Sequence, residues 1–201
     1  MRSYYELTTP LSTVKKSHLV EWFTGDGTLS RRWTLTNVTG TGNAVTNSYG
    51  VSYWTGAGGT AQVTLSLNDV RHFSHTGSVA IWIGQVEATA QGGFGMGAGK
   101  STFWINAIKT VTSTSGYLML YSADASTESG TNTSIPYTET HTPNWNTYKL
   151  EQKNGSSDLT FNGVLEASKT TNQPTISMQP MAYCKLSSKT NSVRYCEAWN
   201  T

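Results

Sequence analysis

Residues 159–166, with the sequence LTFNGVLE, decide the fold class. Two short runs rich in apolar residues flank Asn162-Gly163, the pair that best tolerates positive φ at both central positions of a tight turn. The stretch therefore predicts a β-hairpin. Upstream of it, residues 145–151 predict a strand that ends at Asn154-Gly155, and residues 193–199 predict the last strand of the chain.

Short strands are also predicted from Glu21 onward. Apolar and polar residues alternate in runs that Gly, Asn, Ser and Thr clusters interrupt every ~8 to 15 residues, which is typical of a sandwich. In residues 62–67 the apolar side chains of alternate positions point one way, so one face is buried. Residues 79–83, 103–105 and 117–121 are apolar at every position and predict central strands. We expect an all-β fold of two antiparallel sheets.

The composition narrows the partners. The net charge is +2 over 201 residues, without a basic stripe, so nucleic acid is not expected as a partner. No stretch approaches the ~18 consecutive apolar residues of a membrane span. Seven Trp residues supply apolar anchors for a core although only 13% of residues are charged. We expect a single sandwich domain over residues 21–201.

Residues 1–20 are predicted to form an N-terminal arm. They show poor periodicity and contain Pro10, so they cover a sheet edge, reach a neighbouring molecule, or are a frayed terminus. They lack the apolar run and cleavage site of a secretory signal. We expect an extracellular or particle-surface protein that is numbered from an added Met or leaves its cell by lysis or another signal-independent route.

Both ends of the predicted domain resemble one superfamily. The opening Trp22-Phe23-Thr24-Gly25-Asp26-Gly27-Thr28-Leu29 and Trp33 are similar to the first strand and turn of concanavalin A-like, laminin-G-like jelly rolls. The order WxxYKLE at 145–151, FNGVL at 161–165, Pro174 and VRYxExW at 193–199 resembles their final third. The resemblance implies a concanavalin A-like jelly roll. That superfamily includes lectins, glycan-binding modules, glycosidases, lyases and viral shell or fibre proteins, so the resemblance leaves the function open.

The sequence matches neither a phosphate-binding loop nor the carboxylate pair of a glycosidase. Residues 92–101, GGFGMGAGKS, lack a Gly of the phosphate-loop pattern at Phe94 and precede a strand-like segment, so we expect a flexible or tightly bent connection between two core strands. Glycosidases need two carboxylates about 5 Å apart on one side of the bond, and no such run exists here. Glu87, Glu151 and Glu166 stand alone on separate strands. The sequence predicts no catalytic residue.

No metal or cofactor is predicted. His72 and His75 lie three residues apart in an expected loop, but no further ligands are close in sequence. His18 and His141 are isolated, and Asp26, Asp69 and Asp124 form no dedicated calcium loop.

The two cysteines, Cys184 and Cys196, flank a turn-like run. If that run closes a hairpin, the two sulfurs lie near each other and form a disulfide. Two reduced cysteines in the core are the alternative.

Aromatic residues near loops are the best binding candidates. Sugar rings stack their C–H faces on Trp or Tyr while polar groups take the hydroxyls. Six residues bracket Gly-rich turns or loops and are predicted to bind a glycan: Tyr49, Tyr53, Trp54, Tyr137, Trp145 and Tyr148. Core packing is the alternative for all of them, and it is expected for Trp33, Trp82, Trp104 and Trp199.

The sequence therefore favours a non-catalytic structural or binding module. We expect a surface or assembly component, associated with a virion or another particle, that recognises a glycan and forms a homo-oligomer or binds other structural subunits. A carbohydrate-active enzyme, either a glycoside hydrolase or a polysaccharide lyase, is the alternative on the same fold.

Overall fold

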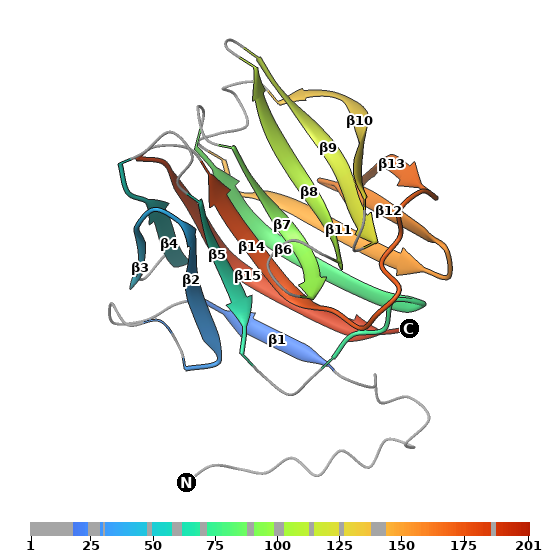
Figure 1. Ribbon diagram of the computed structural model, residues 1–201, viewed down its shortest axis with the longest axis horizontal. Helices are drawn as coiled ribbons and strands as arrows, with labels where there is room; N and C mark the ends of the chain where they lie inside the picture. The colour runs from blue at the N-terminus through green and yellow to red at the C-terminus, as the bar shows by residue number, and fades with distance from the viewer. Residues whose placement is uncertain are drawn as a thin grey trace, which may run out of the picture.

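The computed structural model describes residues 18–23, 29, 31–47, 50–57, 62–68, 72–87, 91–98, 103–112, 115–124, 127–137, 144–185 and 188–201. Every regular element in these residues is a β-strand, and all the strand pairs are antiparallel. No helix in this part of the chain has the length and hydropathy to cross a membrane. The strands form two sheets, which confirms the predicted sandwich (Figure 1).

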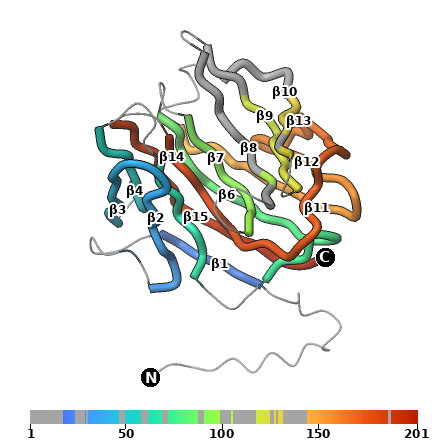
Figure 2. The backbone as a smooth tube through the Cα atoms, in the orientation of Figure 1, coloured from blue at the N-terminus to red at the C-terminus, as the bar shows by residue number. Residues whose placement is uncertain are grey.

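One sheet has eight strands in the order β13-β12-β11-β6-β15-β4-β3, with β1 also paired to β15 (Figure 2). Its strands are β1 (Leu19–Trp22), β3 (Gly42–Asn47), β4 (Gly50–Thr55), β6 (Gly77–Val86), β11 (Asn146–Lys153), β12 (Ser156–Phe161), β13 (Val164–Lys169) and β15 (Thr190–Asn200). Because β1 begins at the buried Leu19, the sandwich starts before the predicted domain boundary at Glu21.

The other sheet has seven strands in the order β10-β9-β8-β7-β14-β5-β2. Its strands are β2 (Trp33–Thr39), β5 (Gln62–Leu67), β7 (Gln91–Ala98), β8 (Phe103–Thr112), β9 (Ser115–Asp124), β10 (Glu128–Tyr137) and β14 (Gln179–Lys185). In β5 the alternating Val63, Leu65 and Leu67 are buried, as their period of two predicts.

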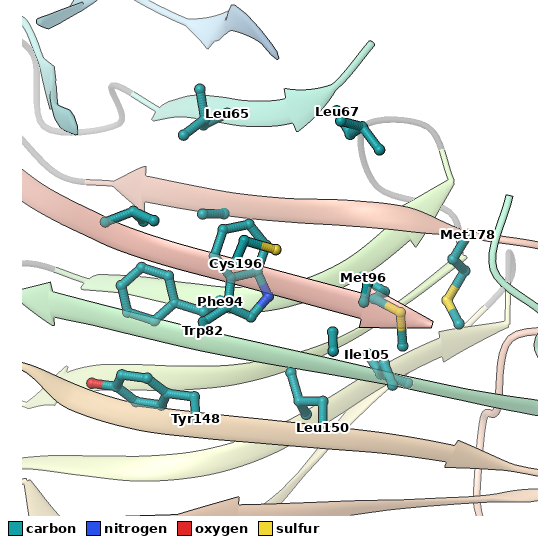
Figure 3. Packing of buried hydrophobic residues seen from close by; sticks show 14 of the residues in the cluster. Leu65, Leu67, Trp82, Phe94, Met96, Ile105, Tyr148, Leu150, Met178 and Cys196 are labelled. Carbon is teal, nitrogen blue, oxygen red and sulfur yellow. The ribbon is translucent and has the colours of Figure 1, made fainter. Parts of the chain in front are cut away.

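The core lies between the two sheets and is rich in aromatic rings. Trp82 of β6, Phe94 of β7 and Tyr148 of β11 form a chain of ring contacts, with centroids 6.0 Å and 4.8 Å apart (Figure 3). Gly84 makes room for this chain, because a Cβ atom there would overlap the Phe94 ring. Trp33 and Trp82 are core residues as expected, whereas Trp199 is half-buried.

The hairpin that decides the fold class is present as predicted. Phe161 pairs with Val164 in register, and the two turn residues have φ angles of 48° for Asn162 and 89° for Gly163. The Asn162 side chain also accepts a hydrogen bond from the Thr147 amide (2.8 Å) and donates one to Asn146 Oδ1 (3.0 Å). These bonds tie the turn to the start of β11.

The Gly-rich run is not the connection that its composition predicted. Residues 91–98 form β7, a buried strand between β14 and β8. Phe94 and Met96 point into the core, and Gly93, Gly95 and Gly97 occupy the positions that alternate with them. The prediction was wrong because the period of two between Gly and apolar residues outweighs the turn propensity of the individual glycines.

Of the two alternatives for the cysteines, the structure has the reduced pair in the core and not the disulfide. Cys184 lies on β14 of the seven-stranded sheet and Cys196 on β15 of the eight-stranded sheet, and both are free and buried. The connection between them crosses from one sheet to the other and therefore does not close a hairpin. Burial raises the pKa of Cys184 to about 12 and that of Cys196 well above its usual value, so both remain thiols at neutral pH.

Candidate functional site

A second group of apolar side chains lies on the outward face of the seven-stranded sheet, away from the core. In β14, Ala182 and Cys184 point inward, so Met181 and Tyr183 point outward. Met181, Tyr183 and Ala123 form a hydrophobic cluster separate from the core, and Tyr121 of β9 packs against it. We call these four residues the outer apolar cluster. Ala123, Met181 and Tyr183 are buried, with Tyr183 the most exposed of the three at 8%, and Tyr121 is half-buried.

The central strand of this sheet, β7, has glycines at its outward positions next to β14. In register, Gly93 lies next to Tyr183 and Gly95 next to Met181, with Gly97 two residues further along β7. Because Phe94 and Met96 fill the core, these three glycines, which we call the glycine track, are on the outward side. Residues without a Cβ atom let another molecule approach the backbone closely.

Hydroxyl groups line the opposite side of β14. Thr64 and Ser66 of β5 pair with Tyr183 and Met181, and they pair in turn with Thr36 and Thr34 of β2. We call these four residues the hydroxyl bank. Thr34 is exposed, Thr36 and Ser66 are half-buried, and Thr64 is buried. Each hydroxyl can donate or accept a hydrogen bond at neutral pH.

The ring of Tyr121 is positioned from the other edge of the sheet. Tyr121 pairs with Gly130 of β10. A Cβ atom at Gly130 would overlap the ring of Tyr121 and would lie 2.7 Å from Met119 Cε. Gly130 therefore leaves room for the ring of Tyr121 over β10.

The outward face carries few charges. The described outward positions of β5, β7, β9 and β14 include no carboxylate, and Glu128 on β10 is in register with Ala123. Lys185 is the cation at the end of β14. Glycoside hydrolysis needs a pair of carboxyl groups about 5 to 9.5 Å apart. Apolar rings next to hydroxyls instead suit the binding of a neutral, amphipathic molecule.

A buried amide holds this face to the rest of the molecule. Asn191 of β15 is 1% exposed, and its Nδ2 donates to the carbonyl of Tyr183 (3.2 Å) while its Oδ1 accepts from the Glu87 amide (3.2 Å). A Cβ atom at Gly92 would overlap Asn191. Gly92 thus makes room for an inter-sheet hydrogen bond that fixes the main chain beside Tyr183.

Glu87 is bonded to residues at the start of β15. Its Oε2 accepts a hydrogen bond from the Thr190 amide (2.8 Å), and its Oε1 lies 3.3 Å from Lys189 Nζ. Glu151 lies near Lys149 and Lys153 on the outer face of the eight-stranded sheet (3.2 and 4.0 Å). These two carboxylates therefore lie on a different sheet from the outer apolar cluster.

The structure describes the side chains of four of the six predicted glycan-binding residues, and these four do not form one exposed group. Tyr53 and Tyr148 are 0% and 1% exposed in the core, so their rings cannot stack on a sugar, and the prediction needs correction for these two residues. Trp54 and Trp145 are half-buried on the eight-stranded sheet, where Trp54 pairs with Thr190 and Trp145 precedes β11. Tyr137 ends β10 with its side chain outside the described part, and Tyr49 lies outside the described residues.

Sequence reasoning missed Tyr121, Met181 and Tyr183. Their signal was weak because these strands are apolar on both faces, so alternation alone does not separate core from surface. The alternation of Gly93, Gly95 and Gly97 with Phe94 and Met96 was the sequence signal for a strand without side chains on its outward side.

No group of three or more His, Cys, Asp or Glu side chains comes together among the described residues. His72 is exposed and His75 half-buried, on either side of Phe73, which bridges to Met178. His18 Nε2 lies 2.8 Å from Glu197 Oε1 of the eight-stranded sheet. His141, Asp26 and Asp69 lie outside the described residues.

No protein-family model matches the sequence, and no curated protein matches it. Solved structures do match over nearly the whole chain. The Crh5 transglycosylase superimposes with a TM-score of 0.68 at 13% identity, covering 93% of this chain and 87% of that one. The Emp47p carbohydrate recognition domain has a TM-score of 0.59 at 8% identity, covering 92% and 95%.

A β-1,3-glucanase from Mycobacterium marinum is similar to the same degree, with a TM-score of 0.64 at 10% identity over 90% of this chain and 97% of that one. At these identities the likeness shows the fold. The chain is a concanavalin A-like jelly roll, the fold shared by these lectin domains and β-glucanases.

Proposed function

We propose that this protein is a non-catalytic module that binds a glycan on the outward face of its seven-stranded sheet. The observation that carries the proposal is the outer apolar cluster, whose residues lie on both sides of the glycine track and, on β14, next to the hydroxyl bank. The described outward positions of β5, β7, β9 and β14 include no carboxylate. Structures with the same fold include a carbohydrate recognition domain, a transglycosylase and a glucanase, which supports a saccharide as the ligand.

The chemistry of the face fits a sugar. A saccharide ring has apolar C–H faces, which pack against tyrosine rings, and hydroxyls around its edge. Tyr121 supplies the more exposed ring, and Thr34, Thr36 and Ser66 supply accessible hydroxyls.

Binding isotherms with neutral oligosaccharides, chosen from a glycan array, test this proposal. The native protein should bind at least one of them, and Tyr121→Ala should weaken that binding. Trp54→Ala and Trp145→Ala remove loop aromatics on the eight-stranded sheet, and they should leave the binding unchanged. A full array without binding would refute the proposal.

The transglycosylase and glucanase structures make a carbohydrate-active enzyme the second candidate. Incubation with polysaccharides, followed by assays for new reducing ends and for unsaturated products, distinguishes the two. A non-catalytic module releases neither product, even when it binds the polysaccharide.

The same module is proposed to act as a surface or assembly component of a virion or another particle, as a homo-oligomer or beside other subunits. The support is β1, where Trp22 is 55% and Val20 43% exposed directly after the N-terminal residues. Because β1 belongs to the sandwich, the deletion that tests this removes residues 1–17 and keeps Leu19. Light scattering should show a smaller assembly after the deletion, and an unchanged mass would refute the arm as a docking element.

A further inference from the structure

A row of polar side chains points inward at one end of the eight-stranded sheet. Gln152 of β11 pairs with Ser78 of β6 and with Ser157 of β12, and Ser157 pairs with Lys169 of β13. All four are buried, with exposures of 0% for Ser78 and Ser157, 1% for Gln152 and 5% for Lys169. Directly opposite residues on one sheet face have Cβ atoms about 4.5–5.5 Å apart, so the row is continuous. We call it the inner polar row.

Part of this row is well bonded. Ser78 Oγ donates to the Ser74 carbonyl (2.7 Å), and Gln152 Nε2 donates to Gln173 Oε1 (3.3 Å) and to the Lys153 carbonyl (3.1 Å). Lys169 Nζ donates to Thr171 Oγ1 (2.8 Å).

Two buried oxygens in the row have no hydrogen-bond partner among the described residues: Gln152 Oε1 and Ser157 Oγ. Ser157 stands between Gln152 and Lys169 in register. An ammonium has three donors, and the described residues give Lys169 Nζ one acceptor, Thr171 Oγ1. Buried polar groups in native proteins are nearly always hydrogen-bonded, because a buried carbonyl oxygen without a donor is unfavourable. Each of the two oxygens therefore requires a partner that the described residues do not supply, and the neighbouring ammonium has donors beyond its bond to Thr171.

We propose that the inner polar row binds one ordered water molecule, which accepts a hydrogen bond from Lys169 Nζ and donates to Gln152 Oε1 and Ser157 Oγ. Internal waters typically make about three such bonds. A metal cation would be repelled by the ammonium. An anion would leave Gln152 Oε1 without a donor. Burial lowers the pKa of Lys169, which agrees with an amine held away from bulk solvent.

The water site connects both sheets. Thr171, the acceptor for Lys169, also accepts through its carbonyl from Ser122 Oγ of β9 (2.9 Å). Gln173 Nε2 donates to the Lys169 carbonyl (3.2 Å) and to the Thr171 carbonyl (3.0 Å). Ser122 lies between Tyr121 and Ala123 in the chain, so the bound water supports β9 from below the outer apolar cluster.

A high-resolution crystal structure of the native protein gives the first test. Solvent density is expected within about 2.7–3.2 Å of Lys169 Nζ, Gln152 Oε1 and Ser157 Oγ. Direct bonds from Nζ to both oxygens, or an empty site, would overturn the proposal.

Oxygen-17 relaxation dispersion of water gives a test in solution, because it counts long-lived internal waters. Lys169→Met should lower the dispersion amplitude by the equivalent of one water. Lys149→Met, on the outer face of β11, should leave it unchanged. Ser157→Val, whose methyl groups fill the site, should repeat the loss and provides a second variant if Lys169→Met does not fold. An unchanged amplitude in a folded variant would contradict the proposal.

Discussion

Asn191 Nδ2 donates a hydrogen bond to the main-chain carbonyl of Tyr183, and this 3.2 Å bond joins a strand of one sheet to a strand of the other. It lies in the core, where Asn191 is 1% exposed, and Gly92 leaves the space that the amide occupies. The bond therefore holds the strand that carries Tyr183 in place from behind.

Asn191→Leu should destabilise the protein by about 1–3 kcal/mol, because the Tyr183 carbonyl and the Glu87 amide each lose a buried partner. Urea unfolding followed by tryptophan fluorescence measures the change. Thr175→Ala, at an exposed position between β13 and β14, is the control and should change stability by less than about 0.5 kcal/mol. Equal stability of the native protein and Asn191→Leu would show that the inter-sheet bond contributes nothing.

Tyr121→Ala should weaken glycan binding by about three- to tenfold, since a stacked aromatic contributes about 0.5–1.5 kcal/mol. Titration calorimetry with the best oligosaccharide from the array measures the loss. Tyr121→Phe keeps the ring and should retain most of the affinity. If Trp54→Ala or Trp145→Ala weakens binding and Tyr121→Ala does not, the glycan binds on the eight-stranded sheet.

Gly95→Val should weaken glycan binding and also lower the stability of the fold, because Gly95 is buried. Gly95 lies next to Met181 on the glycine track, so the two methyl groups of Val would press against the atoms that cover the main chain. Val also favours a strand conformation. Near-UV circular dichroism checks the fold, and calorimetry checks the binding. Undiminished affinity in folded Gly95→Val would place the ligand away from β7.

Cys184 and Cys196 should be unreactive toward a thiol reagent in the native protein and should both react in urea, because both are free and buried. Burial raises the pKa of Cys184 from 9.0 to about 12. The folded pKa lies above the unfolded value, so the stability from the neutral thiol is complete below pH ~9 and is lost as the pH rises toward ~12. Cys184→Ala should reduce this alkaline loss. If neither cysteine reacted with the reagent in urea, the two would be joined in a disulfide.

Lys169→Met should also change the pH dependence of stability, but in the direction opposite to that expected for Cys184→Ala. Burial lowers the pKa of Lys169 from 10.5 in the folded state, so folding disfavours the charged amine. The resulting penalty is complete below the folded pKa and disappears as the pH rises toward 10.5. The native protein should therefore gain stability relative to Lys169→Met over this range. A constant difference in unfolding free energy across the pH series would contradict the lowered pKa.

The sequence was sufficient for the elements whose structure is set by neighbouring residues. Asn162-Gly163 requires positive φ, and the alternation in residues 62–67 separates core from surface within one strand. The site was not accessible in this way, because Tyr121 and Tyr183 come from strands far apart in the sequence that meet only through the sheet order. Tyr53 and Tyr148 were misassigned for a related reason. Both lie near loops in the sequence, but strand alternation turns them into the core.

The glycine track has a consequence for selectivity. On the proposed glycan-binding face, β7 contributes only buried glycines at its outward positions, so it offers no side chain that could distinguish one saccharide from another. Discrimination must then come from the flanking strands, through the hydroxyls of β5 and the rings of β14 and β9. Because those side chains point away from the core, they can be exchanged to alter what the face recognises while the packing beneath stays the same.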